Sequence, residues 1–221
     1  MSFKDCAVVS CGTLVPEITY LKKEGFLDAK SMLFLTPGLH DRSRILEAQL
    51  PKQIKEAKKR SDKIIVVYGG KFCYLPSYDP FATVDKILRD LGPGIARVKA
   101  SHCVDMLASE NEREEISRGE SVWWLTPGWI KYRHQVFFGW DKAMAVENFP
   151  RHTGGAILLD GIGFYEEFTA DRPEELLEYS DWMGLPIMPH EITLDRFKKL
   201  LIEAKLRLEK GIEGVYEDNM D

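Results

Sequence analysis

The fold is decided by one stretch in the first half of the chain, residues 63–70, with the sequence KIIVVYGG. Isoleucine, valine and tyrosine favour β-strands. An unbroken apolar run of this length is typical of a strand that is buried on both faces of a parallel sheet. The Gly69-Gly70 pair then supplies the backbone freedom of a tight turn. The stretch therefore predicts a buried strand over residues 63–68 that ends in a turn.

Six more short apolar runs alternate with longer amphipathic segments along the chain. The runs that indicate strands are residues 7–9, 32–35, 95–98, 122–125, 156–159 and 185–188. The last of them contains Pro186, which cannot donate to a central ladder and therefore places that strand at an edge. Helical patterns cover residues 15–24, 42–59, 81–91, 103–109, 129–138, 141–148, 173–182 and 194–209. This alternation predicts an α/β fold, a Rossmann-like three-layer sandwich with a mostly parallel sheet of about six or seven strands.

Composition sets the class of the protein. The chain has 221 residues, of which 44% are hydrophobic and 29% charged, an ordinary globular balance. We expect a single α/β domain over residues 1–210, followed by an acidic and flexible tail over residues 211–221. The net charge is -5 and no basic stripe is present, which argues against nucleic acid as a partner.

The sequence also predicts a location and a redox state. Its start, MSFKD, lacks the long apolar region of a signal peptide. No apolar run approaches the roughly 20 residues that span a bilayer. We therefore expect a cytoplasmic protein with no membrane partner, in which the four cysteines are thiols or ligands rather than disulfides.

Reactive side chains follow four of the predicted strands. Cys11 follows the first strand, His40 the second and Cys73 the third, and the adjacent pair His102-Cys103 follows the fourth. The carboxyl ends of parallel strands meet at one edge of a sheet, which is where such folds bind ligands. We therefore expect these residues to share one site.

Three thiols and one imidazole would complete a tetrahedral metal site. Cys11, Cys73 and Cys103 supply the thiols, and either His102 or His40 is the fourth ligand. Zinc suits this donor set, and iron or an iron–sulfur cluster is the alternative. A helix predicted to begin at Cys103 would also favour its thiolate. Buried packing is the competing explanation for each cysteine, because free cysteine often fills a core. Packing is the preferred explanation for Cys6, ahead of the first strand.

A cofactor-binding role is also open for four residues near the strand ends. Gly69 and Gly70 could present backbone N–H groups to an anion. Thr126 and Trp129 follow the fifth strand and could form one wall for a planar ligand. The remaining candidates for the same pocket, after the sixth strand, are Asp160, Tyr165 and Glu166. The histidines expected to be purely structural are His134, His152 and His190.

Four sequence blocks carry a resemblance to a known family. They are SCG at residues 10–12, YGGKFC at 68–73, SHCVDMLAS at 101–109 and WLTPGWI at 124–130. They resemble the signature blocks of the domain-of-unknown-function family DUF1638, in the right order. The family's recurring cysteines would correspond to Cys11, Cys73 and Cys103. Its members occur in methanogenic archaea and anaerobic bacteria, often encoded beside corrinoid-dependent methyltransferases and their activators.

The resemblance implies a role in methylamine or related one-carbon metabolism. We expect a metal- or cofactor-binding protein that serves corrinoid-dependent methyl transfer. Its partner would be a corrinoid protein or a corrinoid-dependent methyltransferase, and a bound corrinoid is a further possible cofactor. One alternative is an enzyme, a zinc-dependent methyltransferase that acts on a thiol or a corrinoid. The other is an accessory protein that binds a partner without chemistry of its own.

Overall fold

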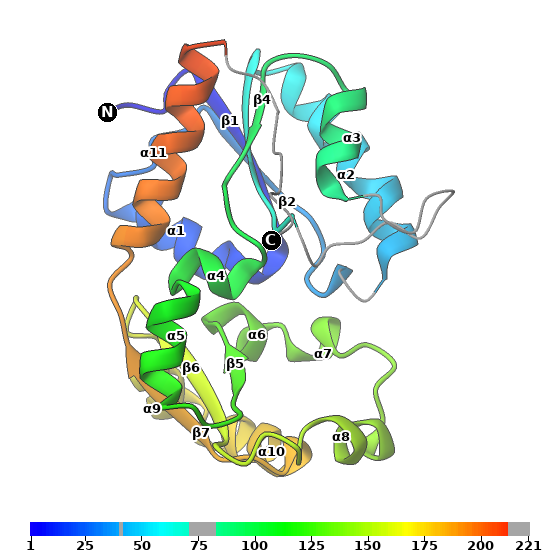
Figure 1. The fold of residues 1–221 in the computed structure, drawn as a ribbon, viewed down its shortest axis with the longest axis vertical. Helices are drawn as coiled ribbons and strands as arrows, with labels where there is room; N and C mark the ends of the chain where they lie inside the picture. The colour runs from blue at the N-terminus through cyan, green and yellow to red at the C-terminus, as the bar shows by residue number, and fades with distance from the viewer. Residues whose placement is uncertain (40–41, 71–82, 212–221) are drawn as a thin grey trace.

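The structure is a computed structural model that describes residues 1–39, 42–70 and 83–211 (Figure 1). Its strands are β1 (Cys6–Ser10), β2 (Ser31–Phe34), β3 (Lys63–Val67), β4 (Ile95–Arg97), β5 (Trp123–Leu125), β6 (Ala156–Asp160) and β7 (Ile187–Glu191). Each of the seven predicted strands is therefore present, within a few residues of its expected bounds.

The helices follow the predicted alternation, with three additions. They are η1 (Gly12–Leu14), α1 (Val15–Lys23), α2 (Ser43–Lys58), α3 (Val84–Asp90), α4 (Cys103–Leu107), α5 (Glu110–Ser117), α6 (Pro127–Lys131), α7 (Arg133–Val136), α8 (Lys142–Asn148), α9 (Phe164–Asp171), α10 (Pro173–Met183) and α11 (Asp195–Glu209). The sequence did not predict η1, α5 or α9, and the helix expected over residues 129–138 is divided between α6 and α7. No described helix is both long and apolar enough to cross a membrane.

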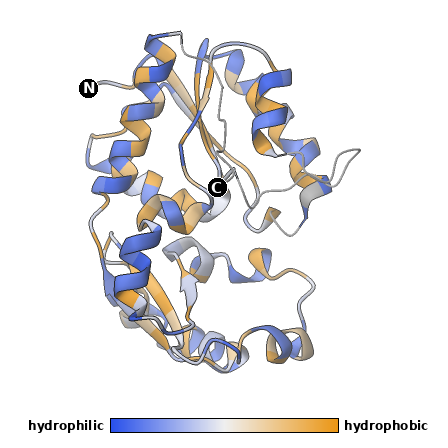
Figure 2. Ribbon diagram, in the orientation of Figure 1, coloured by the Kyte–Doolittle hydropathy of each residue, from blue (hydrophilic) through white to orange (hydrophobic). Residues whose placement is uncertain are grey.

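The first four strands form one parallel sheet in the order β2-β1-β3-β4. The KIIVV segment is β3, which pairs with β1 on one side and β4 on the other, as its unbroken apolar run predicts. Successive side chains of a strand point to opposite faces of the sheet. Val8 and Ile65 accordingly pack with α1 and α11, whereas Val9 and Ile64 pack with α2 and α3. This sheet therefore has helices on both faces, and Figure 2 shows its strands as a largely hydrophobic band.

The last three strands form a second parallel sheet, in the order β5-β6-β7. A single sheet of six or seven strands is therefore not confirmed, and the shown architecture is a mixed α/β fold with two parallel sheets. The described chain between β4 and β5 forms α4 and α5 instead of a crossover that would pair the two strands. Strand β7 lies at an edge, as its neighbouring proline predicts.

Several contacts join the two sheets. The C-terminal helix α11 follows β7 and returns to pack on β3, β4 and α4 of the first sheet. The Thr126 hydroxyl donates to the Thr13 carbonyl at 3.3 Å. A Cβ atom at Gly128 would lie 1.9 Å from that same carbonyl oxygen, so only glycine permits the approach of α6 to η1. The prediction of one domain over residues 1–210 stays a prediction, and tail residues 212–221 lie outside the described part.

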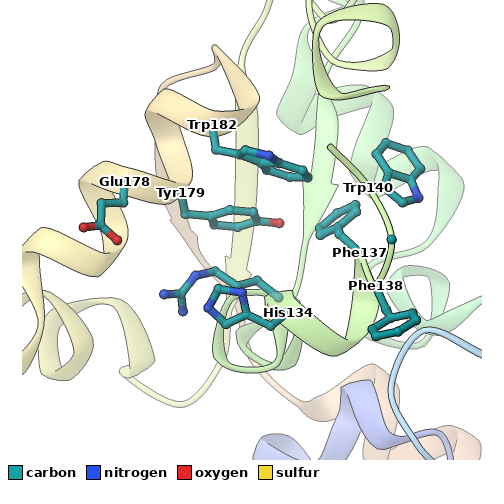
Figure 3. A pocket seen from close by; sticks show the side chains of 9 residues that line it. His134, Phe137, Phe138, Trp140, Glu178, Tyr179 and Trp182 are labelled. Atoms are coloured by element: carbon teal, nitrogen blue, oxygen red, sulfur yellow. The ribbon is translucent and has the colours of Figure 1, made fainter. Parts of the chain in front are cut away.

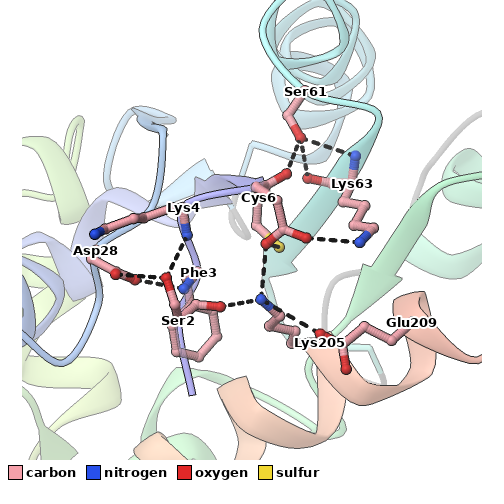
Figure 4. A network of polar contacts seen from close by, with 10 residues as sticks. Ser2, Phe3, Lys4, Cys6, Asp28, Ser61, Lys63, Lys205 and Glu209 are labelled. Carbon is pink, nitrogen blue, oxygen red and sulfur yellow. Dashed lines mark hydrogen bonds and ion pairs between the residues drawn. The ribbon is translucent and has the colours of Figure 1, made fainter.

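The amino end of the first sheet is held by a polar network (Figure 4). Lys205 of α11 binds the Asp5 carboxylate at 2.8 Å and the Ser2 carbonyl, and Lys63 binds Asp5 at 2.7 Å. Cys6 lies beside this network and is fully buried in the core, as expected. The network therefore fixes the amino end of the sheet, whereas Cys11 and Gly69 lie at its carboxyl end.

Candidate functional site

A pocket of about 360 Å³ opens beside the carboxyl ends of β1 and β3. The chain leaves β1 for β2 on one side and later crosses to β3 on the other side, so the strand order reverses between β1 and β3. Open parallel sheets bind ligands in the crevice at such a reversal. The pocket is lined by Cys11, Thr13, Tyr68, Gly69, His102, Cys103, Val104, Met106, Val122, Trp123, Trp124, Trp129 and His152. We call it the two-thiol pocket.

Two thiols meet in its wall around one hydroxyl group. The Cys11 Sγ lies 3.1 Å from the Thr13 Oγ1, and either atom can donate the hydrogen bond. The same hydroxyl, together with the Trp129 side chain, also favours the thiolate of Cys103. The structure thus brings Cys11 and Cys103 to one site, although they lie more than ninety residues apart in the sequence.

Both thiols are protonated at neutral pH in this environment. Burial raises the pKa of Cys11, although Thr13 partly offsets this. Burial and then the neighbouring Cys11 raise the pKa of Cys103 to about 12. The expectation of a thiolate at the start of α4 is therefore wrong. The five-residue helix is too short to offset the loss of water around the sulfur.

His102 also lines the pocket, but one of its ring nitrogens is already used. Its Nδ1 accepts a hydrogen bond from the backbone N–H of Asp105 at 3.2 Å, which caps α4. Burial and then Arg113 lower the pKa of His102, so its ring is neutral at pH 7. The Asp105 carboxylate in turn accepts hydrogen bonds from the Ser101 N–H and hydroxyl and from Arg196. These bonds fix the segment that carries Cys103.

A buried ion pair positions the strand ends behind the pocket. The Arg97 guanidinium binds both carboxylate oxygens of Asp85, at 2.7 and 2.8 Å. Its remaining N–H groups donate to the carbonyls of Tyr68, Val98 and Ala100. Bidentate pairs of this kind fix orientation as well as charge. The loops after β3 and β4 are therefore tied to one guanidinium group.

The two glycines after β3 have different surroundings. A Cβ atom at Gly69 would lie 2.5 Å from the Ser101 carbonyl oxygen, so glycine is needed where the two loops meet in the pocket wall. Gly70 donates to the Ala100 carbonyl and packs on Arg97, and it does not line the pocket. Gly69 thus remains a candidate binding residue, whereas the contacts of Gly70 are structural.

Tryptophans from the second sheet form the opposite wall. Trp129, a predicted binding residue, makes an edge contact with Trp123 at a ring-centroid distance of 6.0 Å. Trp123 makes another edge contact with His152 at 5.2 Å. Sequence reasoning gave no signal for Thr13 and expected His152 to be structural.

The other predicted site residues lie elsewhere. Thr126 is fully buried and bonds to η1 without reaching the pocket. The expectation that Asp160, Tyr165 and Glu166 line the same pocket is wrong, because they line a separate cavity beyond the carboxyl end of β6. Asp160 there accepts hydrogen bonds from the N–H groups of residues 162, 164 and 165. Cys73 and His40 lie outside the described residues.

The donor set of the two-thiol pocket suits a soft ligand. In the described residues, no group of three histidine, cysteine, aspartate or glutamate side chains is arranged to hold a metal ion. The pocket offers two thiols, and no carboxylate lines its described wall. Thiolates favour zinc, monovalent copper or iron–sulfur centres over magnesium or calcium. The described wall of the pocket therefore offers two sulfur donors and two imidazoles.

Comparison with known proteins gives one match. A family model described as "Protein of unknown function (DUF1638)" matches residues 34–201. The match includes Cys103, His102, Gly69 and Trp129, whereas Cys11 lies ahead of it. No curated protein and no solved structure matches the chain.

Proposed function

The chain belongs to the DUF1638 family of proteins of unknown function, and we propose that it is a metal- or cofactor-binding protein whose site is the two-thiol pocket. One observation carries this proposal: Cys11 and Cys103 meet around the Thr13 hydroxyl at the point where the strand order of the first sheet reverses. Zinc is the preferred metal and iron the alternative, because both accept thiolate ligands.

His102 is the candidate for a further ligand, because its neutral imidazole lines the pocket wall. Cys73, which lies outside the described residues, stays the predicted third thiol. When bound, a thiolate-held zinc ion acts as a Lewis acid and makes a coordinated thiol nucleophilic at neutral pH. The protein's own contribution is to hold the donors, keep the tryptophan wall apolar and exclude water.

We further propose that this centre serves corrinoid-dependent methyl transfer. A volume of about 360 Å³ lies at the small end of the range for ligand pockets, which is roughly 300–1,000 Å³. The pocket thus suits a metal with a small thiol better than a whole corrinoid. The corrinoid would be presented by a partner, a corrinoid protein or methyltransferase.

An enzymatic role, zinc-dependent methyl transfer to a thiol, is the second candidate. Catalytic zinc sites keep one coordination position for water or substrate, so this role requires that only three of Cys11, Cys73, Cys103 and His102 bind the metal. An accessory role without chemistry would instead leave function unchanged when Cys11 and Cys103 are replaced.

Metal analysis of anaerobically purified protein tests the proposal. We expect about one thiophilic metal per chain in the wild type and less than a tenth of that in Cys11→Ala and Cys103→Ala. Cys6→Ala is the matched control, because its buried sulfur lies in the core and lines no part of the pocket. Wild-type protein without metal, or equal metal in all four proteins, would refute the proposal.

The methyl-transfer step needs its own assay. Wild-type protein loaded with zinc is incubated with a free methylated corrinoid and a small thiol such as 2-mercaptoethanol. The second candidate predicts formation of the methyl thioether, which Cys103→Ala abolishes and Cys6→Ala preserves. Metal binding without methyl transfer would leave the binding role standing and reject the enzymatic one.

A further inference from the structure

The carboxyl group of Glu17 is buried where the half of the chain that forms the first sheet meets the half that forms the second. Glu17 lies on α1, and its side chain is fully buried. Neither of its carboxyl oxygens has a hydrogen-bond partner among the described residues. A buried charge without a partner is strongly unfavourable. The closed contact between the two halves therefore accepts Glu17 only in its protonated form.

The titratable groups around Glu17 do not compensate a negative charge. Asp160, at the end of β6, disfavours ionisation of Glu17. Tyr132 follows α6, and Glu17 raises the pKa of its phenol. Cys11 precedes η1, and Glu17 is the weakest of the influences on the pKa of its thiol. No positive side chain in the described part of the chain is among the groups that shift the pKa of Glu17, so its carboxylate has no ion pair in the closed contact.

The contact beside Glu17 also closes the two-thiol pocket. Helix α6 packs on both η1 and α1, which follow one another without a break. Thr13 of η1 and Trp129 of α6 both line the pocket. Separation of α6 from α1 would therefore also move the tryptophan wall away from Cys11 and Thr13.

Each half of the chain has a core of its own besides the core that joins them. One such cluster packs α2 and α3 on the first sheet. The other lies around the second sheet and α6 to α10, and Figure 3 shows three of its rings, those of Phe137, Tyr179 and Trp182. Neither cluster contains described strand residues of both sheets. The contact between α1 and α6 can therefore open locally while both halves stay folded.

We propose that Glu17 is a pH-sensitive switch for access to the two-thiol pocket. The protonated carboxyl group allows α6 to pack on α1 and closes the pocket, whereas the carboxylate opens this contact. Opening releases one proton from the Glu17 carboxyl group to the solvent. The switch governs access to the pocket whatever the pocket binds, so it does not rest on the proposed metal.

The direction of the pH effect follows from the two surroundings of Glu17. In the closed contact burial raises the pKa of Glu17 to about 8, whereas a hydrated carboxyl group ionises near 4.5. The resulting stabilisation of the closed contact is complete below the lower value and is lost as the pH rises to and through the higher one. Because one proton leaves on opening, the open fraction should grow about tenfold from pH 6 to pH 7.

Native-state hydrogen exchange of the full chain at pH 6 and pH 7 tests this switch. The reporters are the N–H groups of Ile130 and Tyr132, which bond to the carbonyls of residues 126 and 128. After correction for the intrinsic exchange rates, their protection should fall about tenfold in the wild type between these pH values. It should not change in Glu17→Gln. Glu24→Gln, at the exposed C-cap of α1, is the matched control and should behave as the wild type.

Strand β3, at the centre of the first sheet, distinguishes local opening from unfolding of the whole chain. Low concentrations of urea should accelerate exchange at β3 and leave exchange at Ile130 and Tyr132 nearly unchanged, because the response to urea scales with the surface that opening exposes. Glu17→Met removes the acid and keeps a side chain of similar length, so it should match Glu17→Gln.

Three results would each overturn the proposal. They are wild-type protection at Ile130 and Tyr132 that does not change between pH 6 and pH 7, an equal fall of protection in Glu17→Gln, and a response to urea at these residues as steep as that of β3. Each is measured without metal, so none of them bears on the metal proposal, which Cys11→Ala and Cys103→Ala test separately.

Discussion

At the level of single residues, Thr13 explains how the buried thiol of Cys11 and the partly buried thiol of Cys103 can share one wall of a pocket. Its hydroxyl contacts the Cys11 sulfur at 3.1 Å and also acts on Cys103. A hydroxyl can donate to one sulfur and accept from another. Both thiols are neutral in the metal-free pocket. A metal ion that binds them would displace their protons to the solvent.

The protonated thiols predict a strong pH dependence of metal binding. The pKa values of Cys11 and Cys103 lie above the ordinary thiol value, so both protons must leave when a metal binds. The logarithm of the apparent affinity should therefore rise by at least about two per pH unit between roughly pH 6 and 8. Anaerobic cadmium titrations at several pH values measure this slope.

Two cysteine variants show which thiols contribute to the pH slope of the metal affinity. Cys11→Ala removes one of the protons, so its slope should be lower by about one. Cys6→Ala should retain the wild-type slope, because Cys6 lies outside the pocket. A wild-type affinity that does not change with pH would contradict the assignment of these thiols as ligands.

At the level of elements, the Arg97–Asp85 ion pair fixes the loops that follow β3 and β4. It connects α3 to β4 and, through three carbonyls, to the segments that follow β3 and β4. Both side chains are buried, at 2% and 9% exposure. A buried pair of this kind stabilises little by itself, but the loss of one partner leaves the other charge uncompensated.

Asp85→Asn should therefore destabilise the protein by about 3–5 kcal/mol, as judged by urea unfolding. The double variant Asp85→Leu with Arg97→Leu removes both charges and should recover part of that loss. The matched surface pair is Glu56, near the end of α2, with Lys59, the exposed residue that follows this helix, and Glu56→Gln should change stability far less than Asp85→Asn. Equal effects of Asp85→Asn and Glu56→Gln would show that the buried pair does not hold the loops.

Strands and helices with many apolar residues were predicted from the sequence more completely than polar ones. All seven strands follow from short apolar runs, and β7 was placed at an edge because of Pro186. Helix α5 was missed because no residue in it is buried, so it has no apolar periodicity to detect. Its signal was instead a capping box, formed by Ser109 and Glu112.

The candidate site was predictable only in part. Cys11, Cys103 and His102 could be grouped because strand ends share an edge in a parallel sheet. The wall formed by Trp123 and Trp124 comes from the second sheet, and one continuous sheet would have placed it elsewhere. Such a sheet would need β4 to pair with β5. Strand pairing depends on tertiary context, and the local sequence does not determine it.

On the scale of the whole molecule, the two sheets meet through α1, α6 and α11, and the two-thiol pocket is lined by residues of both halves. Aromatic contacts run from Trp123 to Trp129 and from Trp129 to Phe137, which joins the pocket wall to the core of the second sheet. One hydrophobic core contains residues of both sheets, such as Val8 and Leu159. The site is therefore assembled by the packing of the two sheets and not by either sheet alone.

The carboxyl group of Glu17 is buried by the packing of the two sheets. The carboxyl group is fully buried in α1, and neither oxygen has a hydrogen-bond partner in the described structure. Burial, and to a smaller extent Asp160 at the end of β6, raise the pKa of Glu17 to about 8. Burial and then Glu17 raise the pKa of Tyr132, which follows α6. Glu17 thus lies where α1 meets the elements of the second sheet.

The raised pKa of Glu17 predicts a loss of stability with rising pH. The unfolded chain ionises this group near its ordinary value of 4.5, whereas the folded chain ionises it near 8. The stabilisation is complete below the lower value and is lost as the pH rises through the higher one.

Glu17→Gln removes this dependence. The free energy of unfolding of the variant, relative to that of the wild type, should therefore increase by a few kcal/mol from about pH 5 to pH 8. Urea unfolding at both pH values measures the difference, and Glu24→Gln, at the exposed C-cap of the same helix, is the control. Parallel pH profiles for the wild type and Glu17→Gln would contradict the burial of Glu17 at this junction.

The central claim, that Cys11 and Cys103 together hold a thiophilic metal, is tested most directly by X-ray absorption at the metal edge of protein loaded anaerobically with zinc. The account predicts at least two sulfur neighbours at about 2.3 Å from the metal, lost in the Cys11→Ala, Cys103→Ala double variant and kept in Cys6→Ala. A first shell of nitrogen and oxygen alone, at about 2.0–2.1 Å, would contradict it.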